Sequence, residues 1–295
     1  MSDHQLSMLR QMADDGVDAD DLRINPNGTG YQLHVEDDTF RCSSREELEE
    51  QLDAYDHLIS NWYFWNVDVQ GTSTAGRMFL RWLEQSNELS VSERYQRMDR
   101  EEMYREWGQL AITVEFNEKG ERVYDISHRS DRDHELDDLD VHVDPLEALY
   151  IAKSDDHGEY RPLKGATTLR TGWIYPGLRH EKLLKTVDFI YPASIVNWYL
   201  EQSDRLDVTH YREAADRHTG MFQVIDHLNS DQLASVTDRC CTDETCLKRR
   251  RWQETADQEI PVDPGDGEIP CREPCQVMID EARDVVTSSD SHDHE

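Results

Sequence analysis

The last sixty residues of the chain hold five of its six cysteines. Cys240, Cys241 and Cys246 form one group, and a gap of 24 residues separates Cys246 from the second group, Cys271 and Cys275. Thiolates are soft ligands, and two thiol pairs that converge on one point are typical of a metal centre. In a reducing compartment such clustered cysteines indicate metal ligands rather than disulfides.

Spacing favours one member of the adjacent pair. Cys240 and Cys241 cannot both easily reach the same centre, and Cys241 leaves the cleaner gap of four residues before Cys246. We therefore interpret Cys240 as a neighbouring or packing residue. The remaining cysteine, Cys42, stands alone far upstream and is expected to be a buried structural thiol. The four predicted ligands are Cys241, Cys246, Cys271 and Cys275.

An iron–sulfur cluster fits these gaps better than zinc does. Structural zinc sites usually use cysteines separated by two residues, whereas the gaps here are four and three residues. Between cluster types the spacing is less decisive, because gaps of four and three also resemble thioredoxin-like [2Fe–2S] ferredoxins. Zinc and [2Fe–2S] remain the alternatives to a [4Fe–4S] cluster, with disulfides or free thiols behind them.

Local charges and helix geometry support an anionic cluster. Cys271 and Cys275 lie four residues apart at a predicted helix start, where i and i+4 side chains share a face and free N–H groups stabilise thiolates. The run Lys248–Arg251 follows Cys246 and could offset the negative charge of a four-thiolate cluster. A solvated helix face explains that basic run equally well.

Composition indicates a protein for concentrated salt. The chain has 295 residues, a formal charge of −32, and 63 acidic against 31 basic residues, of which only six are Lys. The acidic residues are dispersed along the sequence rather than grouped in blocks. In molar salt the Debye length is about 3 Å, so the repulsion between these carboxylates is largely screened. Duplex nucleic acid is a poor partner because no basic face is available. The N-terminus is no signal peptide and no segment could span a bilayer, so we expect a cytoplasmic protein.

Short-range patterns predict several elements. Ser44–Glu47 reads as a capping box that opens a helix through about residue 58. The aromatic and β-branched run 62–69 predicts a buried strand. Residues 110–116 and 122–126 flank a turn with Gly120, which predicts a β-hairpin. Further on, residues 158–165 suggest a strand and turn, and helices are expected at 146–152, 180–200 (interrupted near Pro192), 210–228 and 272–286.

These elements predict an α+β fold, in which an N-terminal α+β domain with antiparallel strands precedes a mainly helical domain that carries the cysteines. The dense charge between Ser127 and Asp144 favours a solvated linker over a metal-binding tract. The predicted division is a leader helix at 1–24, an α+β domain at 25–128, an acidic linker at 129–144, the cysteine domain at 145–286 and a disordered tail at 287–295.

Several segments together resemble one known family. The sequence resembles the [4Fe–4S] proteins that are fused to, or encoded beside, CbiX-type sirohydrochlorin cobaltochelatases of the anaerobic cobalamin pathway. The resemblance covers about residues 145–285, and residues 25–128 resemble the family's stabilising domain less closely. It is carried by Gly158–Leu163, Gly172-Trp173, His210–Glu213, Thr219-Gly220, Cys246 with Arg249–Trp252, and the motif Ile269-Pro-Cys-Arg-Glu-Pro-Cys275.

The resemblance implies a [4Fe–4S] cluster held by four cysteines and an accessory role near tetrapyrrole metalation. Chelatase modules of that family insert the metal with paired histidines, and this chain has no segment resembling such a module. We therefore expect a stand-alone cluster protein that carries single electrons or senses redox state beside a cobaltochelatase or a redox partner. An accessory role is favoured over catalysis. The alternative is a non-redox scaffold with a structural four-cysteine site.

Overall fold

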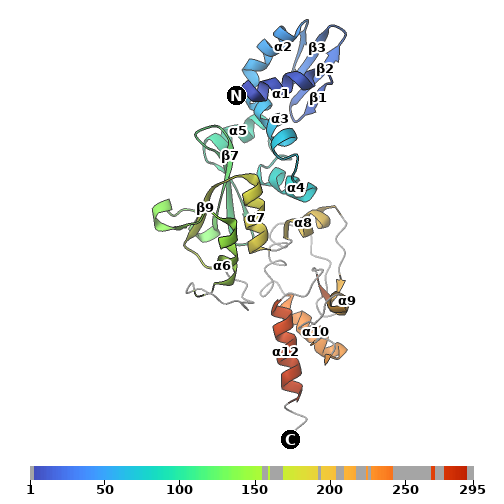
Figure 1. Cartoon of the computed structure of the whole chain (residues 1–295), viewed down its shortest axis with the longest axis vertical. Helices are drawn as coiled ribbons and strands as arrows, with labels where there is room; N and C mark the ends of the chain where they lie inside the picture. Colours follow the sequence, from blue (N-terminus) through green and yellow to red (C-terminus); the bar gives the residue numbers. More distant parts are fainter. Residues whose placement is uncertain are drawn as a thin grey trace. The chain divides into compact units, whose positions relative to one another are not determined.

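The structure is a computed structural model of the chain. It describes residues 3–154, 159, 169–191, 194–203, 209–216, 224, 227–241, 267–269 and 276–290. The chain divides into two compact units (Figure 1). The first contains Met1–Tyr104 and Thr113–Val123, and the second contains Arg105–Ile112 and Tyr124–Glu295.

The first unit begins with a four-stranded antiparallel sheet in the order β1-β2-β3-β4. Leu22 and Ile24 of β2 pair with Val35 and Leu33 of β3, and all four side chains are buried. This alternation places one apolar face toward the helices. The strands are Val17–Ala19, Leu22–Asn27, Gly30–Val35 and Asp38–Cys42.

Three helices cover that face (Figure 1). They are α1 (Asp3–Ala13), α2 (Arg45–Leu52) and α3 (Asp56–Tyr63), with the 3-10 turn η1 (Asp53–Tyr55) between the last two. The predicted start of α2 is confirmed, because the Ser44 side chain accepts a hydrogen bond from the N–H of Glu47. The helix ends at Leu52, earlier than the predicted end near residue 58.

The strand predicted at 62–69 is wrong. The run completes α3 and continues as a π-helical turn, η2 (Phe64–Asp68). Leu58, Trp62 and Trp65 are buried at helical intervals, and the Trp65 indole donates to Asn61 Oδ1 over 3.0 Å, one turn back. The strand preference of aromatic and β-branched residues depends on packing against a neighbouring strand. Here the run packs against helices instead, so its buried side chains follow a helical period.

A buried ion cluster stabilises the remainder of the first unit, which includes α4 (Thr74–Leu83) and α5 (Val91–Asp99). Glu84 is fully buried, and its carboxylate lies 2.8 Å from Arg122 Nε and 3.3 Å from Arg94 Nη1. The Arg122 guanidinium also stacks 4.2 Å from the Phe64 ring. Each charge in the cluster has an opposite partner, which is the condition for placing charges in a core.

A five-stranded sheet has the order β5-β6-β7-β9-β8. Its strands are Met103–Trp107, Leu110–Phe116, Arg122–His128, Trp173–Leu178 and Asp140–Val141. The predicted hairpin is confirmed as β6 and β7, and Gly120 in its turn has φ +72°. β9 pairs antiparallel with β7 and parallel with β8, so β8 is an edge strand.

The core of the second unit lies around Trp107, whose ring meets Trp198 edge-on with the centroids 5.8 Å apart. The Tyr191 hydroxyl accepts from the N–H of Gln109 over 3.0 Å. The predicted break near Pro192 is confirmed, since α7 (His180–Ile190) and α8 (Ser194–Gln202) flank it. At the end of β7, buried His128 accepts through Nδ1 from the N–H of Ser130 over 3.1 Å, which fixes a neutral ring.

The segment 129–144 is not a free linker, which corrects the expectation. It forms the 3-10 turns η3 (Arg129–Asp131) and η4 (Leu136–Asp138) and the strand β8. Asp131 is buried and accepts from the N–H of Gly172 over 2.6 Å. Charge density alone predicts solvent exposure, which holds for most of these carboxylates, but Asp131 is buried and Asp144 accepts from the N–H of Leu146. The turn η5 (Pro145–Glu147) and helix α6 (Ala148–Lys153) follow.

Two further boundaries differ from the expectation. The leader predicted at 1–24 contains β1 and the start of β2, so its boundary falls within a strand. The last helix, α12 (Gln276–Asp290), runs into the predicted tail. The α+β class is confirmed. No helix within the described ranges has both the length and the apolar composition that crossing a bilayer requires.

Candidate metal centre

Cys241 ends the helix α10 (Ser230–Cys240) as its C-cap residue. The helix begins at a capping box, in which Asn229 and Gln232 exchange side-chain-to-backbone hydrogen bonds. At the other end the N–H of Cys241 donates to the carbonyl of Thr237 over 2.8 Å. The first predicted ligand is therefore held at a defined point on a capped helix.

One apolar cluster surrounds this helix end. Cys240 and Cys241 are both buried, and the Cys241 sulfur lies 4.0 Å from the thioether sulfur of Met278 in α12. Arg239 and Glu281 add an ion pair of 3.2 Å between α10 and α12 at the surface. The buried members of the cluster are Tyr211, Leu228, Leu233, Val236, Cys240, Cys241, Ile269, Met278 and Ala282.

A short antiparallel ladder enters the same cluster from the other side. β10 (Thr209–His210) pairs with β11 (Glu268–Ile269), and Ile269 is fully buried. The N–H of Tyr211, the first residue of α9 (Tyr211–Asp216), donates to the carbonyl of Gly267 over 2.8 Å. Gly267 has φ +82°, a conformation that favours glycine, and a Cβ there would lie 2.9 Å from Nε2 at the tip of the exposed His210 side chain.

Three predicted ligands, Cys246, Cys271 and Cys275, lie outside the described residues, as does the basic run at 248–251. Chain connectivity limits how far two of them can lie from the cluster. Cys275 immediately precedes Gln276, so their Cα atoms are about 3.8 Å apart. Cys271 follows Ile269 by two residues, which limits that Cα separation to about 7 Å. In the sequence these two cysteines therefore adjoin β11 and α12, and Cys241 contacts Met278 of α12.

The donor set fits an iron–sulfur cluster. Cys241 offers a soft sulfur ligand, and its surroundings are apolar side chains and a thioether rather than carboxylates. An apolar shell of this kind excludes water and controls the potential of a bound cluster. In the part of the chain that the structure describes, no group of three or more His, Cys, Asp or Glu side chains could hold a metal ion.

Cys42 has no place in this centre. It lies in β4, in the core of the first unit, and is buried. Burial raises the pKa of its thiol, and the nearby Glu47 carboxylate adds to the effect. A thiol with a raised pKa is a poor metal ligand and a poor nucleophile, which agrees with the structural role predicted for it.

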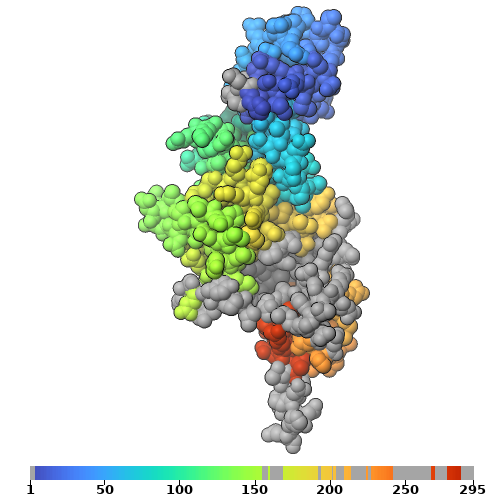
Figure 2. Space-filling view, in the orientation of Figure 1, coloured from blue at the N-terminus to red at the C-terminus, as the bar shows by residue number. Residues whose placement is uncertain are grey.

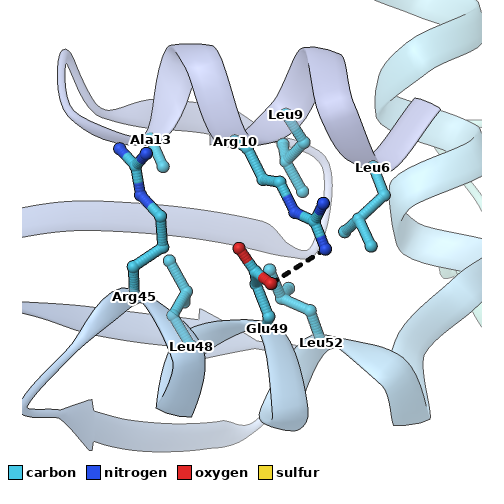
Figure 3. Close-up of a pocket in the computed structure, with 8 residues that line it drawn as sticks. All are labelled: Leu6, Leu9, Arg10, Ala13, Arg45, Leu48, Glu49 and Leu52. Carbon is cyan, nitrogen blue, oxygen red and sulfur yellow. Dashed lines mark hydrogen bonds and ion pairs between the residues drawn. The ribbon is translucent and has the colours of Figure 1, made fainter. Parts of the chain in front are cut away.

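The first unit has a shallow depression between α1 and α2 (Figure 3). Leucines from both helices line it, and Arg10 bridges its mouth to Glu49 over 2.8 Å. The space is sufficient for about one water molecule. It is too small to bind a cofactor or substrate.

Sequence reasoning missed the residues that organise the centre. The sequence predicts that Met278 belongs to a helix but indicates no contact for it, and no local pattern identifies Gly267. The apolar spacing Met278, Ile279 and Ala282 marks one helix face, but nothing local shows that this face meets Cys241. Arg212 of α9 donates to the Leu228 carbonyl over 3.2 Å, so it helps to connect α9 to the segment before α10.

Three family comparisons match consecutive parts of the chain. Residues 203–284 match a 4Fe-4S iron-sulfur cluster binding domain, and this range contains all five C-terminal cysteines. Residues 91–202 match the DR2241 stabilising domain, and residues 2–70 match a domain of unknown function, DUF7348. The chain is an iron–sulfur protein, and its cofactor is a [4Fe–4S] cluster.

One solved structure is similar in part. It is DR2241 from Deinococcus radiodurans, described as a multi-domain protein with structural similarity to chelatases but also with two additional novel domains. The identity is 24% and the TM-score is 0.46, over 63% of this chain and 39% of that one. This chain therefore spans about two-fifths of the length of that protein. No curated protein matches the chain.

Proposed function

We propose that Cys241, Cys246, Cys271 and Cys275 hold one [4Fe–4S] cluster, through which the chain exchanges single electrons or responds to redox state. The observation that carries the proposal is the match of residues 203–284 to a cluster-binding domain that contains every one of these cysteines. The buried cluster that joins α10, β11 and α12 supports it, because Cys241 belongs to this cluster, and Cys271 and Cys275 adjoin β11 and α12 in the sequence.

The choice of Cys241 over Cys240 rests on its contact. Both thiols are buried, but the sulfur of Cys241 is the one found 4.0 Å from Met278, in the first turn of the helix that follows Cys275. A ligand must face the same region as the other ligands. Cys240 then serves as a packing residue on the last turn of α10.

A bound [4Fe–4S] cluster supplies one-electron chemistry, with a potential set by hydrogen bonds, charge and exposure. The protein residues contribute the surroundings. Met278, Ile269 and Tyr211 exclude water from the neighbourhood of Cys241. The cations at 248–251 would offset the negative charge of four thiolates, which raises the potential.

The proposed setting is cobalamin or sirohydrochlorin metabolism, in which the chain acts beside a cobaltochelatase or a redox partner. The resemblance of residues 145–285 to cobaltochelatase-associated cluster proteins supports this setting. The partner is proposed to be a protein rather than duplex nucleic acid, because the charge of −32 would repel phosphates.

We further propose that the chain works in the cytoplasm of a cell with molar internal salt. The dispersed acidity and the shortage of Lys support this. The expected result is a free energy of unfolding that rises with potassium chloride concentration into the molar range. Maximal stability in dilute buffer would contradict the proposal.

A second function remains in competition, in which the cluster only holds the C-terminal region together. The close packing of α10 on α12 favours it, since a site between two helices suits a structural role. Reversible reduction separates the two functions. A carrier shows a reduced state with an EPR signal and recovers its oxidised spectrum, whereas a scaffold loses its cluster or its fold on reduction.

The decisive experiment is anaerobic purification, followed by iron and sulfide determination and by visible and EPR spectra before and after dithionite. Four iron and four sulfide per chain are expected for one [4Fe–4S] cluster. A sample with bound zinc, or with neither iron nor sulfide, would sink the proposal. Mixing the reduced protein with a cobaltochelatase then tests the proposed setting by its effect on cobalt insertion.

A further inference from the structure

Exposed apolar side chains are concentrated in one segment of the second unit. Of nine large hydrophobic residues that are exposed within the described ranges, six lie between residues 136 and 150. The light green segment in Figure 2 shows this part of the chain at the surface. Isolated exposed apolar residues need no explanation, but a concentration of them in so polar a chain indicates a contact surface. The six are Leu136, Val141, Val143, Leu146, Leu149 and Tyr150.

Among the described residues, no strand pairs with the outer edge of β8, which lies at the centre of this segment. On its inner edge the N–H groups of Asp140 and His142 donate to the carbonyls of Gly172 and Ile174, over 3.0 and 2.8 Å. Because successive N–H groups of a strand point to opposite sides, the N–H and C=O of Val141 point away from β9. The backbone is extended at Leu139, in β8 and at Asp144, and the His142 N–H still bonds to Ile174, so we expect the N–H of Val143 to point outward as well.

The side chains along β8 divide between two faces. The His142 ring stacks on the Tyr175 ring with the centroids 5.2 Å apart, and its Nδ1 forms a hydrogen bond of 2.9 Å with Glu147 Oε2. The face of β8 that carries His142 is therefore covered. Val141 and Val143 lie on the opposite face and are 50% and 65% exposed. An exposed edge strand with exposed β-branched residues is a template for pairing with another strand.

The charges beside this edge select the partner. Asp137, Asp138, Asp140, Asp144 and Glu147 lie within or next to the extended segment, and residues 133–152 contain no Lys or Arg. From other elements, Arg170 lies 3.2 Å from Asp140 and Lys182 Nζ donates to the Val143 carbonyl over 3.5 Å, so carboxylates remain in excess. Charge complementarity therefore requires basic residues in whatever covers the edge. A second copy of this chain would bring the same five carboxylates to the contact, which disfavours self-pairing.

We propose that the edge of β8 is a docking site for an extended segment of a partner protein in which apolar and basic residues alternate. The segment adds a strand to the sheet, and its backbone bonds to the outward N–H and C=O of Val141 and to the N–H of Val143. Its apolar side chains cover Val141 and Val143, while its basic side chains meet the flanking carboxylates. The site is independent of the cysteine centre, so either proposal can fail alone.

The probe is a short synthetic peptide of alternating Lys and Val, blocked at both ends and labelled for fluorescence anisotropy. We compare the full chain with Val141→Pro, which removes the outward N–H and leaves the N–H groups that bond to β9. Val141→Thr keeps the N–H and the branched shape. Leu149→Ser removes an exposed apolar side chain of α6, away from the edge.

The expected result is saturable binding that weakens about tenfold in Val141→Pro and changes less than about threefold in Val141→Thr and Leu149→Ser. The Val141 and Val143 amides should gain protection from hydrogen exchange when the peptide is added. A peptide with alternate amides N-methylated should bind at least about tenfold more weakly to the unaltered chain, whether or not Val141→Pro folds.

Three results would overturn the proposal. Equal binding of the N-methylated peptide would show attraction by charge without strand addition. Equal loss in Leu149→Ser and Val141→Pro would place the contact on the helix face. A concentration-dependent dimer that Val141→Pro abolishes would assign the edge to a second copy of the chain.

Discussion

Substitution of the adjacent thiols Cys240 and Cys241 can separate the contribution of buried sulfur to packing from its contribution to cluster ligation. Their side chains are 2% and 4% exposed and belong to the same apolar cluster. Replacing either by Ala removes one buried sulfur. In the cluster-free protein both changes should therefore lower the free energy of unfolding by similar amounts, about 1–2 kcal/mol each.

In the cluster-bound protein the two variants should differ. Cys241→Ala removes a proposed ligand, so iron and sulfide per chain should fall and the EPR signal of the reduced sample should shrink or change shape. Cys240→Ala should keep the cluster content of the unaltered chain. A bound cluster stabilises the folded state, so Cys241→Ala should also lose most of the stability difference between cluster-bound and cluster-free protein.

The assay combines iron and sulfide determination on anaerobic samples with urea denaturation before and after removal of the cluster. Cluster loss in Cys240→Ala with retention in Cys241→Ala would refute the ligand assignment. Clearly unequal stabilities of the two cluster-free variants would refute the packing argument, because it rests on equal burial. Equal cluster loss in both would mean that the turn, rather than one sulfur, is required.

Three further predictions concern burial, backbone and charge. Glu84→Gln should lower the free energy of unfolding of the first unit by about 3–5 kcal/mol, because the buried Arg122 guanidinium loses its carboxylate partner, whereas Arg94 keeps Asp20 at 3.2 Å. Glu49→Gln breaks a pair of the same 2.8 Å length at the surface and should cost at most about 1 kcal/mol, and equal effects in denaturant titrations would contradict the role of burial. Gly267→Ala should destabilise the β10–β11 region by about 1–3 kcal/mol and reduce cluster yield. Gly120 has a similar positive φ, but a Cβ there would have no atom within 4 Å, so Gly120→Ala measures the backbone cost alone. The two variants should differ in cluster yield. Burial lowers the pKa of His128; the Asp131 carboxylate partly opposes this shift, and the Arg129 guanidinium adds to it. As pH falls, the unfolded chain therefore takes up the proton at a higher pH than the folded chain does. The free energy of unfolding should then decrease as pH drops below about 6.5. His128→Gln should flatten this dependence between about pH 5 and 6.5 in thermal unfolding curves, and an unchanged slope would show that other groups cause it.

Local patterns predicted much of the fold because they depend on near neighbours. The N-cap at Ser44, the Gly120 hairpin and the helices on either side of Pro192 each follow from a few adjacent residues, although the Glu47 carboxylate accepts from Ser43 and does not complete the predicted capping box. The run 62–69 failed because its aromatic residues favour a strand in isolation, whereas the neighbouring helices supplied a surface for a helix. The acidic segment 129–144 failed for a related reason, since charge density does not reveal that Asp131 caps Gly172.

By itself, the sequence determined the cofactor class and the α+β fold. The identity and spacing of the cysteines indicate the ligand chemistry even when the tertiary structure is unknown. Only the tertiary structure decided that Cys241 lies against Met278, that Gly267 adopts a positive φ beside His210, and that β8 is the last strand of the described sheet. These contacts join residues distant in the chain, and no local period encodes them, because burial is decided by which faces the whole fold brings together.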